Sequence, residues 1–203
     1  MAFALLSPYD KSGLIEFARV IVSAGYDLVS TGGTHAVLDG AGLPVRQVAD
    51  VTGSPEILDG RVKTLHPVIH GGLLARRSNP DHVAQLKEHN IQPIDIVVGN
   101  LYPFRETISK PGVTLENALE NIDIGGPTMV RAAAKNFPDV VIVVDPDDYE
   151  RVGEMLANGG VPLDERRRLA AKAFQHVALY DTAVANYLRD VPADDPAEQL
   201  FPE

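Results

Sequence analysis

Short apolar runs alternate with segments of helical periodicity along most of this chain. Phe3 to Leu6 and Ile94 to Val98 are typical of buried strands, and Val140 to Val144 is a further run of β-branched residues. Leu163 to Leu188 carries apolar residues at three- and four-residue steps, which predicts the longest helix of the chain. Strands that alternate with helices predict βαβ units and a mainly parallel sheet, so the expected fold class is α/β.

The shorter segments fit the same alternation. After a polar break at Ser7 to Lys11, we expect a helix that Gly25 ends, then a strand over Tyr26 to Val29 and a short helix to Gly40 or Gly42. Further helices are predicted over Pro80 to Asn90, Thr114 to Asn121, from Pro127 onward, and over Asp147 to Ala157.

Two segments have a different interpretation. The period is lost from Asp50 to Arg77, and an irregular stretch of this length with many polar residues is expected to be functional. The apolar stripe within Leu163 to Leu188 is expected to pack against the core or a partner subunit, and we assign it no chemistry.

Composition narrows the class of protein. The 203 residues include no cysteine and carry a formal net charge of −10, and five acidic residues lie between Asp190 and Glu203. Binding of nucleic acid depends on Lys and Arg, so nucleic acid is a poor match for this surface. No apolar run approaches the roughly 20 residues that span a bilayer, and the N-terminus does not resemble a secretory signal. We expect a cytoplasmic protein with one domain over 1–189 and an acidic, proline-containing linker or tail over 190–203.

Two turns after strands are candidates for binding phosphate. Thr31-Gly32-Gly33-Thr34 precedes a predicted helix, whose free N–H groups and positive dipole end favour an anion. Asp10-Lys11 follows the first predicted strand, and such turns lie at the ligand-binding edge of open α/β sheets. A plain tight turn and a solvated surface lysine are the alternatives.

The segment Arg61 to Pro67 (RVKTLHP) alternates polar and apolar residues. In an extended conformation it would direct Arg61 and Lys63 to the same side, as a local cationic pair, and a half-exposed edge strand is the alternative. His66 and His70 are four residues apart, but Pro67 lies between them and would disrupt a helix interior. No third ligand falls at a recognised spacing, so we predict no metal site.

Two further segments carry candidate catalytic groups. Asn100 and Tyr102 follow a predicted strand, where an amide can donate to a developing oxyanion, although a structural turn is the alternative. Asp123 precedes a predicted helix, and Lys135 lies two turns into it beside three alanines, which suggests little room around its amine. A carboxylate–amine pair for proton transfer is one interpretation, and a solvated lysine is the other.

Together these segments resemble a known family. The stretches YDKSGL from Tyr9, STGGT from Ser30, LDGRVKTLHP from Leu58, HGGLLARR from His70, NLYPF from Asn100, NIDIGGPT from Asn121 and RAAAKN from Arg131 occur in family order. The chain resembles the N-terminal IMP cyclohydrolase domain of the bifunctional purine-biosynthesis proteins that also carry AICAR transformylase.

The resemblance implies a methylglyoxal-synthase-like, three-layer α/β/α fold and a homodimer. The implied activity is cyclisation of the nucleotide FAICAR to IMP with loss of water, without a metal, redox cofactor or folate. No transformylase domain follows Glu203, so we expect a truncated protein rather than a single-function version.

The resemblance also implies residue roles. It assigns catalysis to Lys135, Asp123, Lys63, Tyr102 and Asn100, with Lys135 the favoured proton donor or acceptor. It assigns contacts with the nucleotide phosphate and ribose to Tyr9, Asp10, Lys11, Thr31, Gly32, Gly33 and Thr34. It assigns contacts with the base to Arg61, Val62, Thr64, Gly99 and Ile124.

Two other functions share the expected fold. A methylglyoxal-synthase-like lyase would use the turn at Thr31 to Thr34 but not Lys63, Tyr102 and Lys135. A regulatory module would bind a nucleotide without converting it, and retention of every candidate reactive side chain argues against it.

Overall fold

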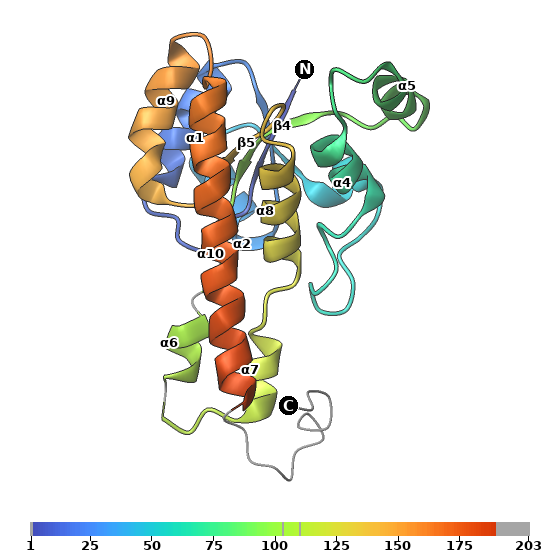
Figure 1. Cartoon of the computed structure of the whole chain (residues 1–203). Coiled ribbons are helices and arrows are strands. Elements are labelled where there is room, and N and C mark those ends of the chain that lie inside the picture. Colours follow the sequence, from blue (N-terminus) through green and yellow to red (C-terminus); the bar gives the residue numbers. More distant parts are fainter. Residues whose placement is uncertain (1, 103, 110, 190–203) are drawn as a thin grey trace.

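A five-stranded parallel sheet forms the centre of the molecule, in a computed structural model that describes residues 2–102, 104–109 and 111–189 (Figure 1). Its strands are β1 (Phe3–Leu6), β2 (Asp27–Ser30), β3 (Val45–Gln47), β4 (Ile94–Val98) and β5 (Val141–Val143), in the order β3-β2-β1-β4-β5. Leu5 of β1 is aligned with Val29 of β2 on one side and with Val97 of β4 on the other. The parallel sheet confirms the predicted α/β class.

Helices cover both faces of this sheet and give three layers (Figure 1). Side chains alternate between the faces of a strand, so Ala4 and Leu6 belong to one buried cluster and Phe3 and Leu5 to the other. The first cluster includes residues of α1 (Leu14–Ser23), α2 (Gly32–Gly40) and α9 (Tyr149–Ala157). The second includes residues of α3 (Val48–Thr52), α4 (Pro67–Leu74), α8 (Gly125–Lys135) and most buried residues of α10 (Leu163–Arg189).

The long helix α10 packs against α8 and β5 and then continues past the sheet (Figure 1). Four residues of the predicted stripe of α10 are buried, namely Leu169, Ala173, Val177 and Tyr180, whereas Phe174 is exposed. The C-terminal part of α10 packs against α6 (Phe104–Ile108). Other helices are α5 (Pro80–Glu88), α7 (Leu115–Glu120) and the 3-10 turn η1 (Pro146–Asp148). Among the described residues, none of the helices combines the length and apolarity that crossing a membrane requires.

The structure differs from the sequence prediction in four elements. β3, α3 and α6 were not predicted, and α4 lies in the segment from Asp50 to Arg77 that was expected to be irregular. Pro67 occupies the first turn of α4, where its missing N–H costs nothing, and Nδ1 of His66 accepts the N–H of Val68 at 3.2 Å. Proline therefore starts this helix rather than interrupting one. The predicted tail over 190–203 lies outside the described residues.

Candidate active site

The candidate site lies where loops leave the carboxyl ends of β1, β2 and β4. The chain passes from β1 outward to β2 and β3, and then returns to place β4 on the other side of β1. Ligands of open α/β sheets bind outside the carboxyl ends of strands at such a switch point. Ser7 follows β1 and Gly99 follows β4, and the N–H of Ser7 donates to the carbonyl of Val98 at 2.8 Å. The two loops therefore begin side by side.

A cavity of about 600 Å³ opens at this edge, and we name it the Lys63 cavity. It brings together side chains from segments far apart in the sequence, including Lys63, Tyr102 and Asp123. Its lining residues are Ser7, Asp59, Gly60, Arg61, Lys63, Thr64, Tyr102, Leu119, Glu120, Asn121, Ile122, Asp123, Ile124, Gly125, Gly126 and Met129. Three of the five predicted catalytic residues are thus in one place, together with Arg61, Thr64 and Ile124 from the predicted base contacts.

The ammonium group of Lys63 lies near an acidic side chain and near the first turn of α2. Its Nζ is 3.7 Å from Oε1 of Glu56, and both side chains are partly exposed. A Cβ built on Gly32 would lie 4.0 Å from the same Nζ. Lys63 is therefore next to the predicted phosphate turn, where the N-terminus of α2 also favours an anion.

Arg61 points to a different partner from Lys63. Its guanidinium forms an ion pair with Glu120 of α7, and both side chains are exposed. Between the two cations, Val62 is tied to Ile57 by an isolated bridge, with N–H···O distances of 3.2 and 3.3 Å. Arg61 and Lys63, the predicted cationic pair, thus line one cavity, but each contacts a different acidic residue, Glu120 and Glu56 respectively.

Backbone hydrogen bonds fix the loop that carries Asp123. Oδ1 of Asp123 accepts the N–H of Gly126 at 2.9 Å, and the N–H of Asp123 donates to the hydroxyl of Tyr180 at 2.7 Å. A Cβ built on Gly126 would lie 2.2 Å from Oδ2 of Asp123 and 2.9 Å from Cδ2 of Leu101, so no larger residue fits there without a shift. The carboxylate is therefore held close to the loop that contains Leu101 and Tyr102.

An aromatic pair separates the Lys63 cavity from a second one. The rings of Tyr9 and Tyr102 meet edge to face with their centroids 4.6 Å apart. Tyr102 lines the Lys63 cavity, and Tyr9 lines a neighbouring cavity of about 960 Å³ that we name the Lys172 cavity. This cavity is lined by Tyr9, Asp10, Lys11, Asn100, Leu101, Glu106, Val144, Asp145, Pro146, Lys172, Gln175, His176 and Leu179.

The ammonium group of Lys172 is paired with one carboxylate that lines the Lys172 cavity and with another beside it. Nζ of Lys172 lies 2.6 Å from Asp145 and 2.7 Å from Asp148. Burial opposes the charge of Lys172, but the hydrogen bonds to these carboxylates outweigh it and raise the pKa of Lys172. The hydrogen bond from Lys172 in turn lowers the pKa of Asp145. The larger cavity is therefore not the better catalytic candidate, because its main cation is already engaged.

Four predicted residues line the Lys172 cavity instead of the Lys63 cavity, namely Tyr9, Asp10, Lys11 and Asn100. The amide of Asn100 binds the backbone of Asp10 twice, because Oδ1 accepts its N–H at 2.8 Å and Nδ2 donates to its carbonyl at 3.2 Å. Nζ of Lys11 donates to the carbonyl of Tyr9 at 3.0 Å. Hydrogen bonds from the hydroxyl and N–H of Ser12 lower the pKa of Asp10. Asn100 thus ties the loop after β4 to the loop after β1.

The turn from Thr31 to Thr34 lies at the start of α2, beside the loop after β1. Thr34 is buried, and its hydroxyl donates to the carbonyl of Pro8 at 3.2 Å. Gly32 has φ +48°, a left-handed conformation that favours glycine. The two predicted phosphate turns therefore follow neighbouring parallel strands, as the sequence indicated, and Thr34 contacts the loop that leads to the other turn. Gly99 leaves little room, because its built Cβ would lie 3.2 Å from Cε of Met129.

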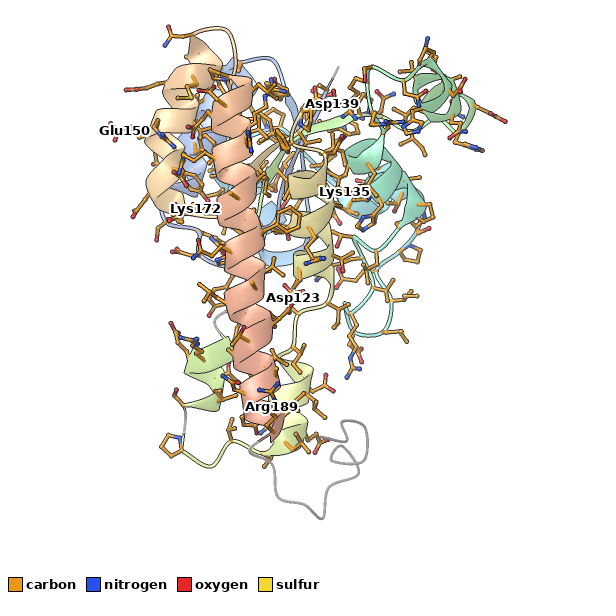
Figure 2. All side chains as sticks on the ribbon, viewed as in Figure 1. Asp123, Lys135, Asp139, Glu150, Lys172 and Arg189 are labelled. Atoms are coloured by element: carbon orange, nitrogen blue, oxygen red, sulfur yellow. The ribbon has the colours of Figure 1, made fainter. Side chains whose placement is uncertain are left out.

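Lys135 does not join the other predicted catalytic residues within the chain. Figure 2 shows Asp123 before the first turn of α8 and Lys135 at the other end of that helix. The 11 residues of α8 span about 16 Å. Ala132, Ala133 and Ala134 are buried, but the side chain of the next residue, Lys135, points outward and is exposed. The interpretation of a confined amine beside Asp123 is therefore wrong for a single copy of the chain.

Sequence reasoning missed two polar residues of α10. Nε2 of His176 accepts the N–H of Leu101 at 3.2 Å, and Tyr180 accepts the N–H of Asp123 as described above. Tyr180 lies in the apolar stripe of α10, which predicts packing, and the sequence around His176 predicts no role for it. Neither has a local signal, because their partners lie 75 and 57 residues away in the sequence.

A resident metal ion finds no ligand set in the part of the chain that the structure describes, since no three His, Asp or Glu side chains gather there. The side chains of His66 and His70 have different environments from each other. His66 caps α4 and lies 3.3 Å from the hydroxyl of Ser54, while burial lowers the pKa of His70.

Comparison with known proteins gives two family matches. Residues 13–128 match the model of the MGS-like domain, and residues 133–202 match that of the AICARFT/IMPCHase bienzyme. One curated relative is the bifunctional purine biosynthesis protein PurH of Chloroflexus aurantiacus, 59% identical over 192 residues. Another is PurH of Leuconostoc mesenteroides, 60% identical over 203 residues.

The matches differ in how much of each protein they cover. The chain is covered to 95% and 100% in these two alignments, but it spans only 38% of either relative. A solved structure described as the crystal structure of ForH superposes with a TM-score of 0.84 at 38% identity, covering 91% of this chain and 95% of that chain. The fold thus agrees with a solved structure over nearly its whole length.

Proposed function

Because this chain belongs to the MGS-like domain family, and its C-terminal part matches the AICARFT/IMPCHase bienzyme, we propose that it is an IMP cyclohydrolase. One observation carries the proposal, namely that Lys63, Tyr102 and Asp123 line one cavity near the first turn of α2. The PurH relatives and the bienzyme match support the substrate, FAICAR, and the product, IMP. The proposal includes a single domain over residues 1–189 and a cytoplasmic location.

The reaction closes a ring and releases water. The carboxamide nitrogen of FAICAR attacks the formyl carbon, a C–N bond forms, and the formyl oxygen becomes the hydroxyl of a tetrahedral adduct. In this step one proton of that nitrogen is passed to the formyl oxygen. The formamide nitrogen then loses its proton and forms a C=N bond to the same carbon, while the C–O bond breaks and the hydroxyl, after it gains a proton, leaves as water. Such a sequence needs a proton acceptor near the nitrogen and a donor near the oxygen.

The Lys63 cavity holds candidates for both needs. Asp123 is the acceptor in our proposal, because its Oδ1 is fixed by Gly126 and its carboxylate lines the cavity. Tyr102 and Lys63 are the donors toward the formyl oxygen. Arg61, Val62, Thr64, Gly99 and Ile124 contact the base in this assignment, while Asn100 positions the loop after β1 through Asp10.

The phosphate and ribose belong near the N-terminus of α2. Thr31, Gly32, Gly33 and Thr34 offer backbone N–H groups and the positive end of the helix dipole. Lys63 adds a cation there, since its Nζ lies about 4 Å from a Cβ position on Gly32. Tyr9, Asp10 and Lys11 belong to the adjoining loop, which Thr34 holds through Pro8.

A catalytic role for Lys135 and a homodimer are linked proposals. Lys135 is exposed at the far end of α8, so in our proposal a second copy of the chain brings it to a cavity. A Lys135→Ala variant that binds IMP normally but has lost turnover would support this role. Full turnover in that variant would contradict it.

One assay tests the proposed function. The purified chain is incubated with FAICAR without folate, added metal or a second nucleotide, and formation of IMP is followed. We expect conversion to IMP. A folded chain that binds IMP but forms none from FAICAR would favour a regulatory module, and conversion of dihydroxyacetone phosphate to methylglyoxal would favour the lyase.

A further inference from the structure

One face of α10 offers two polar side chains that contact the loops of the candidate site. His176 and Tyr180 are four residues apart, so they lie one above the other on the helix. Nε2 of His176 accepts the N–H of Leu101 at 3.2 Å, and the hydroxyl of Tyr180 accepts the N–H of Asp123 at 2.7 Å. The same helix therefore holds the backbone of both loops.

The two held loops carry the proposed proton donor and acceptor. Leu101 directly precedes Tyr102, and the other bond is made by the backbone of Asp123 itself. The loops also lie close together, because a Cβ built on Gly126 would be 2.9 Å from Leu101 and 2.2 Å from Asp123. A change in the position of one loop would therefore displace the other.

We propose that His176 and Tyr180 are positioning residues that set the separation between Tyr102 and Asp123 in the Lys63 cavity. The inference rests on the proposed function, because it concerns the donor and acceptor of that reaction. Neither residue needs to touch the substrate, since His176 lines the neighbouring Lys172 cavity and Tyr180 lines neither. Their effect passes through Leu101 and Asp123.

The bond to His176 requires a neutral imidazole. Nε2 can accept the N–H of Leu101 only while it carries no proton. The charged groups around it are Lys172 on α10, Asp145 after β5, Glu106 on α6, and Asp10 with Lys11 after β1. Burial is the main cause that lowers the pKa of His176, Lys172 lowers it further, and Asp145 opposes them. Acidification should therefore weaken the hold on Leu101.

The bond to Tyr180 depends on a single buried hydroxyl. Tyr180 is buried, and its ring meets that of Phe104 edge to face at 6.2 Å. Replacement by Phe keeps this ring contact and removes only the acceptor for the N–H of Asp123. The N–H of Asp123 is partly buried, and a donor that loses its partner there costs free energy, so the loop of Asp123 should rearrange.

Paired variants separate positioning from packing. Tyr180→Phe is matched by Tyr187→Phe, because the ring of Tyr187 also packs on Phe104, at 5.7 Å, but its hydroxyl holds no loop of the site among the described residues. His176→Leu removes the acceptor of Leu101, whereas His176→Gln keeps an oxygen acceptor that does not titrate. Each variant is compared with the parent chain for kcat and KM with FAICAR between pH 5.5 and 8.5, and for affinity for IMP.

The expected results differ between the variants. Tyr180→Phe and His176→Leu should lower kcat about tenfold while KM and IMP affinity stay within about twofold, because a lost hydrogen bond displaces the reacting groups. Tyr187→Phe should keep the kcat of the parent. His176→Gln should restore most of the kcat lost in His176→Leu and weaken the fall of activity at acid pH.

The outcomes distinguish this inference from the proposed function. Absence of conversion by the parent chain would reject the proposed function and this inference with it. Conversion by the parent with unchanged kcat and pH profile in both Tyr180→Phe and His176→Leu would overturn the positioning role alone. An equal loss of kcat in Tyr187→Phe would also overturn it, because packing would then explain the effect. Tyr180→Phe still carries the test where His176→Leu fails to fold.

Discussion

The Lys63 cavity and the Lys172 cavity meet at the ring pair of Tyr9 and Tyr102, and their charged side chains are held differently. In the Lys172 cavity, the ammonium of Lys172 lies within 2.7 Å of two carboxylates. In the Lys63 cavity, the nearest carboxylate to Lys63 is 3.7 Å away and belongs to the partly exposed Glu56. A cation that is already paired contributes to the fold, whereas a loosely paired one is available to a ligand.

The largest expected effect of this difference is at Asp123. Asp123→Asn keeps an oxygen that can accept the N–H of Gly126, but it removes the proposed proton acceptor. We expect kcat for FAICAR to fall by about 10³-fold, within the range for loss of a general base, with little change in stability. Steady-state kinetics and thermal unfolding measure the two quantities.

A matched change in the other cavity provides the control for Asp123→Asn. Asp145→Asn removes a carboxylate that pairs with Lys172, so it should lower stability and leave kcat close to that of the parent. A comparable loss of kcat in both variants would mean that the two cavities do not differ in the way proposed here.

The next largest effect is expected at Lys63. Lys63→Met keeps an unbranched chain of similar length and removes the charge beside Glu56 and the N-terminus of α2. We expect kcat/KM for FAICAR to fall about 10²-fold, as for loss of one electrostatic donor in a site. Isothermal titration with IMP shows how much of this loss is binding, and unchanged kcat/KM would remove Lys63 from the site.

The sheet could be predicted because its central strands are buried on both faces. Phe3–Leu6 and Ile94–Val98 have the bounds that their apolar runs indicated. β3 is an edge strand, and its last two residues, Arg46 and Gln47, are exposed, so its sequence carries no apolar run. The other edge strand, β5, is buried, and its apolar run from Val140 to Val144 did predict it. Exposure, rather than the edge position alone, therefore weakens the signal.

The unpredicted helix α4 has a different physical cause. It contains Gly71 and Gly72, which lower the intrinsic preference for a helix. A Cβ built on Gly72 would lie 2.6 Å from the carbonyl oxygen of Gln92. The glycine is therefore needed for close packing against the segment before β4, and such a tertiary contact cannot be read from local sequence.

Part of the candidate site could be predicted from the order of strands and turns along the chain. The turns after β1, β2 and β4 meet because parallel strands end at one edge, so spacing along the chain was enough. Lys63 and Asp123 share a cavity only through the packing of their loops, and that required the structure. Lys135 shows the limit, since three buried alanines beside it did not imply that its own side chain is buried.

A smaller effect is expected from Lys172, and it should appear in stability rather than turnover. Lys172→Met removes a partner of Asp148, a buried carboxylate that keeps its ion pairs with Arg151 and Arg168. Because these partners remain and Lys172 is itself partly exposed, we expect a loss of about 1 kcal/mol in the free energy of unfolding. Denaturant titration measures it, and kcat for FAICAR should stay within about twofold of the parent. A large loss of kcat with unchanged stability would reverse the roles of the two cavities.

The smallest expected effect is a pH dependence of stability that His176 and His70 share. Burial is the leading cause that lowers the pKa of each from 6.5, so the unfolded chain binds more protons than the folded chain as the pH falls below that value. The stabilisation is complete above pH 6.5 and is lost as the pH falls through the lowered pKa of each folded histidine. The carboxylates with lowered pKa, Asp10 and Asp145, act in a separate window, below their usual 3.8.

Variants assign this dependence to a place in the molecule. His176→Gln should flatten the decline in stability between pH 6.5 and 5, and His70→Gln should do so as well. The measurement is the urea midpoint as a function of pH for each variant. A slope that stays the same in His176→Gln would mean that protonation of His176 does not oppose folding. The hydrogen bond from Leu101 to His176 would then be too weak for protonation in the Lys172 cavity to change the position of the loop that carries Tyr102.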